Sequence, residues 1–233
     1  TYMRMLRSIY NRGVDMHQAP YVHGLFRDVF TGVDTRQKKA IPIGELHMLL
    51  NKDPQSEKLR RTQAIANLLF QFCGMPFSDL AHLEKSNLER GLLKYNRTKT
   101  GTPMSIEVLE SAQNAIGGLY NKSDARSSGY PDYLFRILSG AYKRNEEGAY
   151  REYQSALRRF NNELKSLSRK LRLHSPVTSY TLRHSWATTA KYRGVPIEMI
   201  SESLGHKSIK TTQIYLKGFE LEERTKVNKL NYS

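Results

Sequence analysis

The chain has 233 residues, which is enough for one large domain or two small ones with a hydrophobic core. Hydrophobic residues make up 39% and charged residues 25%, and no apolar run approaches the roughly 18 residues of a membrane span, so we exclude a disordered tail and a membrane partner. A formal net charge of +15 is typical of a surface that binds a polyanion, most often nucleic acid, although a solubilising surface without a partner stays the alternative.

The N-terminal part is predicted to form a helix and then an irregular basic connector. Apolar residues at helical spacing predict the helix over residues 2–15. Residues 19–43 mix prolines and glycines with basic side chains, which indicates a connector. We therefore expect two parts: residues 1–39, left over from a preceding domain, and residues 40–233, which form a domain of their own.

The middle third is predicted to combine helices with one β-hairpin. Two strand-like runs between residues 92 and 106 flank a turn containing Gly101, which predicts a hairpin with Lys99 near its tip. Lys94 is expected to face elsewhere, because side chains alternate along a strand. Apolar periodicity predicts the surrounding helices at residues 44–50, 58–72, 107–116 and 131–141.

The last third begins with an apolar stripe about six helical turns long. In a compact domain such a stripe is more often a buried helix face than a coiled-coil seam, and we favour the buried face. Together with the single hairpin, this predicts a mainly α fold with a small antiparallel β-sheet (α+β). The stripe comprises Tyr150, Tyr153, Leu157, Phe160, Leu164, Leu167 and Leu171, and shorter helices are predicted at residues 181–193, 196–204, 208–216 and from Glu220 onward.

The most specific pattern lies near the C-terminal end. Arg183 and His184 open a predicted helix, a Leu-Gly-His turn ending at His206 follows, and Tyr215 comes nine residues after that histidine. This pattern resembles the C-terminal signature of the tyrosine recombinases, the phage integrase family, and most closely divergent integrases of bacterial mobile elements. The resemblance is continuous over residues 179–219 and extends more weakly over most of the second part, which implies the catalytic-domain fold of that family.

The residue types suit strand cleavage without a metal. A tyrosine hydroxyl can form a reversible phosphodiester with DNA, while fixed guanidinium and imidazole donors stabilise charge on the phosphate oxygens. The resemblance implies that Tyr215 is the nucleophile and that Arg183 and His206 bind the phosphate. His184 is a further phosphate donor or general base, and Lys99 matches the hairpin lysine that protonates the departing 5′ oxygen. We expect no cofactor and no metal.

Two positions depart from the family pattern. An arginine normally stands where this chain has Pro76, or, in some divergent integrases, where it has Cys73. Tyr180 stands in place of the first histidine, and its hydroxyl can still donate a hydrogen bond. Asp79 matches an acidic residue expected to orient its neighbours. Three possibilities follow from the missing arginine. Another basic residue, such as Arg60, Arg61 or Arg97, supplies the positive charge, or the domain is slow, or it is inactive.

The resemblance implies a site-specific DNA recombinase that cleaves and rejoins strands through a 3′-phosphotyrosine, for integration or excision of a mobile element. It implies double-stranded DNA as partner, a homotetramer at synapsis, accessory DNA-bending proteins, and a place at the nucleoid of the bacterial cytoplasm. Residues 1–39 would then end a core-binding domain. Two alternatives stay open: a non-catalytic helix-turn-helix-type module with Tyr215 buried, and a type IB topoisomerase that relaxes supercoils without synapsis.

Overall fold

The computed structural model describes residues 2–31, 40–122 and 130–216, and its contacts divide the chain into two units, residues 1–38 and 39–233. The first unit contains the predicted helix α1 (Tyr2–Asp15), none of whose described side chains is buried. The Tyr10 hydroxyl holds the following segment against this helix: it donates to the Pro20 carbonyl at 2.9 Å and accepts from the Val22 amide at 2.6 Å.

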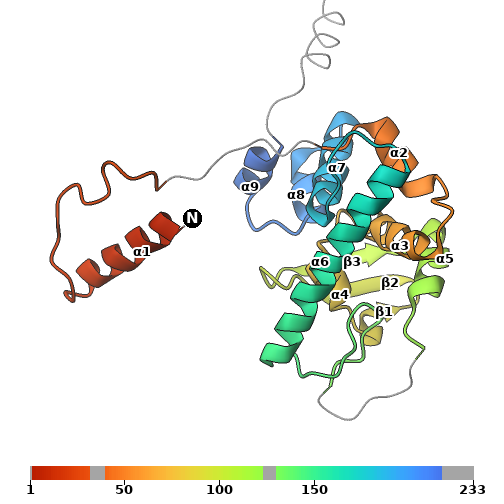
Figure 1. The fold of residues 1–233 in the computed structure, drawn as a ribbon, viewed down its shortest axis with the longest axis horizontal. Coiled ribbons are helices and arrows are strands. Elements are labelled where there is room, and N and C mark those ends of the chain that lie inside the picture. The colour runs from red at the N-terminus through yellow and green to blue at the C-terminus, as the bar shows by residue number, and fades with distance from the viewer. Residues whose placement is uncertain (1, 32–39, 123–129, 217–233) are drawn as a thin grey trace, which may run out of the picture. The chain divides into compact units, whose positions relative to one another are not determined.

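The second unit contains a three-stranded antiparallel sheet with the strand order β1-β2-β3, and helices lie next to this sheet (Figure 1). The predicted hairpin is confirmed by strands β2 (Leu92–Asn96) and β3 (Pro103–Glu107), and the turn between them carries Lys99. A short strand that the sequence did not predict, β1 (Leu88–Glu89), pairs with β2. The expected fold class, mainly α with a small antiparallel sheet, is confirmed.

Most predicted helices of the second unit are confirmed within a few residues, and among the described residues there is one further short α-helix and a 3-10 turn, η1 (Lys85–Asn87). The additional helix, α4 (Phe77–Ala81), follows the turn at Gly74 and places Asp79 in the interior. The terminal helix predicted from Glu220 lies outside the described residues. The confirmed helices are α2 (Ile43–Asn51), α3 (Glu57–Gln71), α5 (Glu110–Leu119), α6 (Glu147–Lys170), α7 (Ser179–Tyr192), α8 (Ile197–Ser203) and α9 (Ile209–Tyr215).

Helices α3 and α6 contribute much of the core. α3 packs against α5, α6 and α7, because its apolar side chains recur at three- and four-residue spacing and form one buried face. The stripe of α6 is also a buried face, with Phe160, Leu164 and Leu167 at most 3% exposed. Tyr150, which we assigned to this stripe, is instead 64% exposed, and Ala156 is buried on the same helix. In Figure 1, α6 runs along the length of the second unit.

The helix predicted over residues 131–141 is wrong. Tyr133 and Phe135 instead form isolated antiparallel bridges to the segments that follow α4 and α5. Tyr133, Leu134 and Phe135 are at most 2% exposed, so three consecutive side chains are buried. When consecutive side chains are all buried, apolar residues fall at helical spacing by chance and do not indicate an amphipathic helix. This explains the error.

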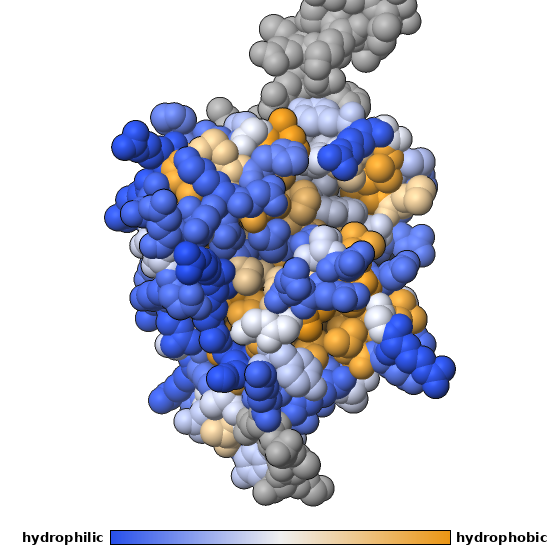
Figure 2. Space-filling view, turned by 90° about the vertical axis from the view of Figure 1, so that its right-hand side faces the viewer, coloured by the Kyte–Doolittle hydropathy of each residue, from blue (hydrophilic) through white to orange (hydrophobic). Residues whose placement is uncertain are grey.

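One face of the second unit is predominantly polar (Figure 2). The face shown in Figure 2 is largely hydrophilic, with hydrophobic residues gathered in smaller patches between the polar ones. Within residues 2–31, 40–122 and 130–216, no helix is both long and apolar enough to cross a membrane.

Candidate active site

The candidate site is centred on Arg183, in the first half of α7. The helix begins with a reciprocal pair of contacts: the Thr178 hydroxyl accepts from the Thr181 amide at 3.2 Å, and the Thr178 amide donates to the Thr181 hydroxyl at 2.8 Å. Such a capping box satisfies backbone donors that the first turn leaves without intrahelical partners. It therefore fixes the turn from which Arg183 projects. The side chain of Arg183 lies in the interior, with 6% of the residue exposed.

Two backbone carbonyls hold the Arg183 guanidinium. Nη1 donates to the Gly74 carbonyl at 2.8 Å, and Nη2 donates to the Leu204 carbonyl at 2.7 Å. Gly74 has a φ of +65°, and a Cβ there would come within 3.2 Å of the Trp186 Cβ and 3.3 Å of the Arg183 Cα. Glycine at this position therefore lets the turn after α3 approach α7 closely enough to present its carbonyl.

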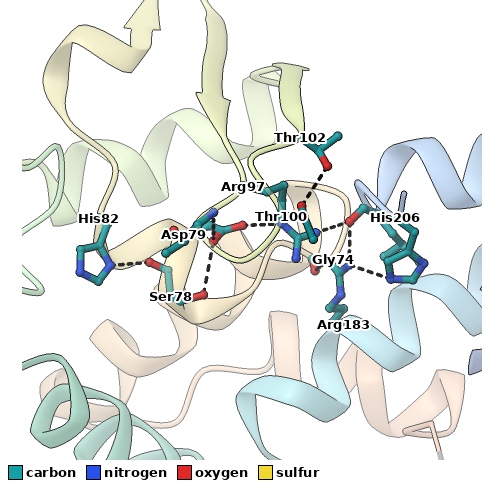
Figure 3. Close-up of polar contacts among 11 residues, drawn as sticks. Gly74, Ser78, Asp79, His82, Arg97, Thr100, Thr102, Arg183 and His206 are labelled. Atoms are coloured by element: carbon teal, nitrogen blue, oxygen red, sulfur yellow. Dashed lines mark hydrogen bonds and ion pairs between the residues drawn. The ribbon is translucent and has the colours of Figure 1, made fainter. Parts of the chain in front are cut away.

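A second guanidinium, that of Arg97, reaches the same region from the end of β2. Its Nη1 donates to the Leu204 carbonyl, which is also an acceptor for Arg183 (Figure 3). Its Nε lies 2.8 Å from Oδ2 of Asp79, whose Oδ1 accepts from the Thr98 amide at 3.2 Å. Asp79 therefore orients the beginning of the hairpin turn, in agreement with the structural role expected for it.

The Leu-Gly-His turn is fitted closely to the hairpin. Gly205 has a φ of +64°, and a Cβ on it would lie 2.7 Å from Sδ of Met104 and 3.0 Å from Cγ of Arg97. A side chain there would require the side chains of Met104 and Arg97 to shift, because real Cβ atoms do not approach other atoms this closely. The glycine thus brings the carbonyl before it and the histidine after it up to the two arginines.

His206 completes the buried group. Its Nε2 lies 3.3 Å from Nη2 of Arg183, and its Nδ1 lies 2.7 Å from the hydroxyl of Thr212, which is fully buried in α9. Burial, followed by the positive charges of Arg183, Arg97 and Lys99, lowers the pKa of His206 from 6.5 to about 4. The ring is therefore neutral near pH 7. Since arginine can only donate, Nε2 accepts from Arg183, and the ring proton lies on Nδ1 toward Thr212.

The other predicted site residues lie around this group. Lys99 is exposed in the hairpin turn, and its charge reaches His206. Tyr180 is 41% exposed and lies on α7 one turn before Arg183, with His184 half-buried on the same helix. Tyr215 is the last residue of α9, one turn after Thr212, and its side chain is not among those described. The Lys191 ammonium donates to the carbonyl of Leu216 at 3.2 Å, which ties the end of α9 to α7.

Of the three substitute cations proposed from the sequence, only Arg97 contacts the described part of the buried group. Arg60 pairs instead with Asp53 and Glu57 on the surface. Arg61 donates to the Arg136 carbonyl. Neither Pro76, which precedes α4, nor the Cys73 thiol, whose pKa is raised by burial, offers a positive charge.

Sequence reasoning missed the groups that hold the arginines and the histidine in place. These are the carbonyls of Gly74 and Leu204 and the hydroxyl of Thr212, none of which has a chemical signature of its own in the sequence. The available signal was glycine next to the functional positions, which often marks a close backbone approach. Within the described ranges, no cluster of three or more His, Cys, Asp or Glu residues could hold a metal ion.

Comparison with known proteins assigns the chain to a family. The model of the phage integrase family matches residues 43–221, which is more than half of the chain and spans the whole buried group. The chain belongs to the phage integrase family.

Two relatives match this chain over most of its length. A probable integrase/recombinase protein of Methanocaldococcus jannaschii is 28% identical over 204 residues, covering 84% of this chain and 58% of its own length. Tyrosine recombinase XerD of Halalkalibacterium halodurans is 30% identical over 190 residues, covering 77% and 57%. The chain thus spans less than two thirds of the length of these relatives.

Solved structures share the integrase fold at lower sequence identity. A crystal structure of XerA recombinase matches 85% of this chain and 66% of that protein with a TM-score of 0.60 and 22% identity. The Tn1549 transposon integrase in complex with a circular intermediate DNA matches 96% and 77%, with a TM-score of 0.63 and 16% identity. Both are similar to this chain in fold.

Proposed function

We propose that this chain is the catalytic part of a site-specific DNA recombinase that cleaves and rejoins strands through a 3′-phosphotyrosine. The observation that carries the proposal is the convergence of Arg183 and His206, held by α7 and the turn before α9, in a member of the phage integrase family. The relatives named tyrosine recombinase and the integrase bound to DNA support it. Integration or excision of a mobile element is the corresponding biological task.

In the proposed reaction, the Tyr215 oxygen attacks the scissile phosphorus and the bond to the 5′ oxygen breaks. The departing 5′ oxygen takes a proton from Lys99, and the DNA keeps a 3′ phosphate esterified to the tyrosine. Arg183 stabilises the charge on the non-bridging oxygens. A 5′ hydroxyl of the partner strand then attacks the same phosphorus and releases the tyrosine, so that the number of ester bonds is conserved.

Three imidazole or phenol groups have supporting roles in this proposal. His206 is neutral before DNA binds, and a phosphate oxygen placed beside it would raise its pKa and favour donation from Nε2. His184 is the candidate for a further phosphate donor or the base that accepts the Tyr215 proton. Tyr180 offers a hydroxyl donor at the solvent side of the same helix.

The partners follow from the same proposal. Double-stranded DNA matches the net charge of +15, and the affinity should fall steeply with salt because phosphate contacts release counterions. Four copies would assemble at synapsis, with accessory DNA-bending proteins, at the nucleoid of the bacterial cytoplasm. Residues 1–39 would be the end of a core-binding domain, and residues 40–233 the catalytic domain.

The two alternative functions are not favoured. In a helix-turn-helix module, α8 and α9 would serve only to present a recognition helix, yet the turn between them is built into the arginine and histidine group. Relatives that match most of the chain are named as recombinases rather than as topoisomerases or transcriptional regulators.

Covalent capture tests the proposal. The protein is incubated with fragments of the DNA that flanks its own gene, and the DNA in adducts that survive detergent is sequenced to define the crossover site. We expect adducts with the parent protein and none with Tyr215→Phe, while Tyr150→Phe, at an exposed position of α6, should form them normally. Absence of adducts with the parent, or their persistence with Tyr215→Phe, would overturn the proposal.

A further inference from the structure

We propose that Arg97 supplies the phosphate-binding guanidinium that neither Pro76 nor Cys73 can provide, so that the scissile phosphate is held between Arg97 and Arg183. This inference rests on the proposed function and assigns a further catalytic residue to it. The cation would then come from the end of β2 rather than from the turn before α4.

The first support is the convergence of the two guanidinium groups on one atom. Arg97 and Arg183 are 86 residues apart in the sequence (183 − 97), yet both donate to the Leu204 carbonyl (Figure 3). The two groups are therefore neighbours in a fixed arrangement. A guanidinium carries five N–H donors, and the contacts of Arg97 with Leu204 and Asp79 engage one on Nη1 and the one on Nε. The planar group thus retains further N–H donors, and guanidinium donors are well suited to binding phosphate oxygens.

The second support is that the fold makes room for this side chain. Gly205, at a φ of +64°, lets the Leu-Gly-His turn lie against the aliphatic part of Arg97, where a Cβ would come within 3.0 Å of Cγ. Asp79, 2% exposed, fixes the direction of the head group through Nε. A donor held in place before the substrate arrives is what stabilises developing charge most effectively.

The third support is the electrostatic environment. The pKa of His206 is lowered by burial and then by Arg183, Arg97 and Lys99, so three cations from two segments act at one imidazole. Burying two guanidinium groups side by side is costly unless anionic partners balance them. Asp79 balances one of these charges, and a phosphate diester would add a second negative charge at the place where the cations meet.

The competing explanation is that Arg97 is only a structural residue that joins Asp79 to the turn before His206. Its 7% exposure and its ion pair fit that explanation as well. The two explanations differ in one respect: a phosphate ligand matters only while the phosphate is charged, whereas a structural contact matters for every substrate.

A neutral substrate separates the two explanations. Suicide duplexes carrying the crossover site are prepared with either an ordinary scissile phosphate or a methylphosphonate, in which one charged oxygen is replaced by a methyl group. Single-turnover adduct formation is measured at saturating protein for the parent, Arg97→Ala and Arg97→Lys. Arg61→Ala, which removes an arginine that contacts the Arg136 carbonyl, is the matched control.

We expect Arg97→Ala to be about 10²- to 10³-fold slower than the parent on the phosphate duplex, because it lacks one preorganised donor. On the methylphosphonate the parent and the variant should differ by less than about tenfold, since little charge is left to stabilise. Arg61→Ala should match the parent on both duplexes. If Arg97→Ala fails to fold, as judged by its thermal unfolding, Arg97→Lys is compared in the same way.

Two outcomes would overturn the inference: equal loss on both duplexes, or a loss of less than about fivefold on the phosphate. Failure of the inference is distinguishable from failure of the proposed function. If only the inference fails, the parent still forms an adduct that depends on Tyr215, and only the Arg97 variants behave differently from expectation. If the proposed function fails, no adduct depends on Tyr215 at all.

Discussion

The two sides of the candidate active site are built differently. Arg183, Arg97 and His206 lie in the interior or half-buried, and each is held by contacts to other segments of the chain. Lys99 and Tyr180 lie at the solvent side, on a turn and on the first turn of a helix. The comparison teaches that, under the proposed function, the groups that stabilise charge on the phosphate are held in position by the fold, whereas Lys99 and Tyr180 lie where DNA could reach them. Variants on the two sides should therefore affect catalysis and stability in different proportions.

The largest effect is expected on the exposed side. Lys99→Ala should slow adduct formation by about 10²- to 10⁴-fold, because the departing 5′ oxygen loses its proton donor. Thermal unfolding should hardly change, since the side chain is exposed. A duplex with sulfur in place of the 5′ oxygen needs no proton donor, so the defect should largely disappear on it. Lys94→Ala, at an exposed position of β2, is the control. An equal defect with Lys94→Ala would contradict the role of Lys99 as the proton donor.

On the buried side, Arg183→Ala should lower both the rate and the stability. Loss of a preorganised donor is expected to slow cleavage by about 10²- to 10³-fold. The Gly74 carbonyl would also lose its donor, at a cost of about 1–3 kcal/mol for a buried group left unsatisfied, whereas the Leu204 carbonyl keeps its contact with Arg97. Denaturant unfolding and single-turnover cleavage measure the two losses. Arg193→Ala, exposed just after α7, should change neither, and an Arg183→Ala variant as stable as the parent would contradict the structural role of the contact with the Gly74 carbonyl.

A smaller effect is expected for the hydroxyl that orients His206. Thr212→Val keeps the shape of the buried side chain but removes the acceptor for Nδ1–H, so the imidazole is less well fixed. One neutral hydrogen bond contributes about 1 kcal/mol, and we expect cleavage to slow by about five- to tenfold. Thr211→Val, on the exposed side of α9, should be neutral. If the two variants behave alike in single-turnover cleavage, Thr212 does not position the histidine.

The smallest effect is the pH dependence of stability that His206 contributes. Its pKa is about 4 in the folded chain, below the value of about 6.5 expected after unfolding, so the unfolded state takes up the proton first as the pH falls. The contribution is fully present above about pH 6.5 and is lost as the pH falls toward 4. The parent should thus lose more stability than His206→Gln between about pH 7 and pH 5. Urea unfolding at both values tests this, and parallel losses would contradict it.

Much of the helical fold could be predicted because its elements are amphipathic. In α3 and α6, apolar side chains on one face bury against the core, so their spacing reports the helix directly. The segment of residues 131–141 failed because its apolar side chains are buried in succession between two neighbouring segments. Tyr150 failed for a different reason: in the first turn of α6 the buried position is occupied by Ala149, and Tyr150 lies next to it on the exposed side of the helix.

The candidate site could be predicted only as far as residue types and spacing reach. The juxtaposition of Arg183 and His206 agrees with the spacing of the C-terminal motif. Arg97 could be offered only as one of three arginines, because its role depends on which segments meet in space. Its neighbours are a carbonyl from the α8–α9 turn and a carboxylate from α4, and no local pattern connects these positions.

The single carbonyl of Leu204 that accepts from both arginines has an evolutionary consequence. Where several segments of a chain meet, a guanidinium group can come from one segment or from another and still lie at nearly the same place in the site. If Arg97 acts as proposed, an arginine missing from the usual position of the motif would not by itself mark a chain of this kind as inactive, because a cation beside the Leu204 carbonyl can come from another segment.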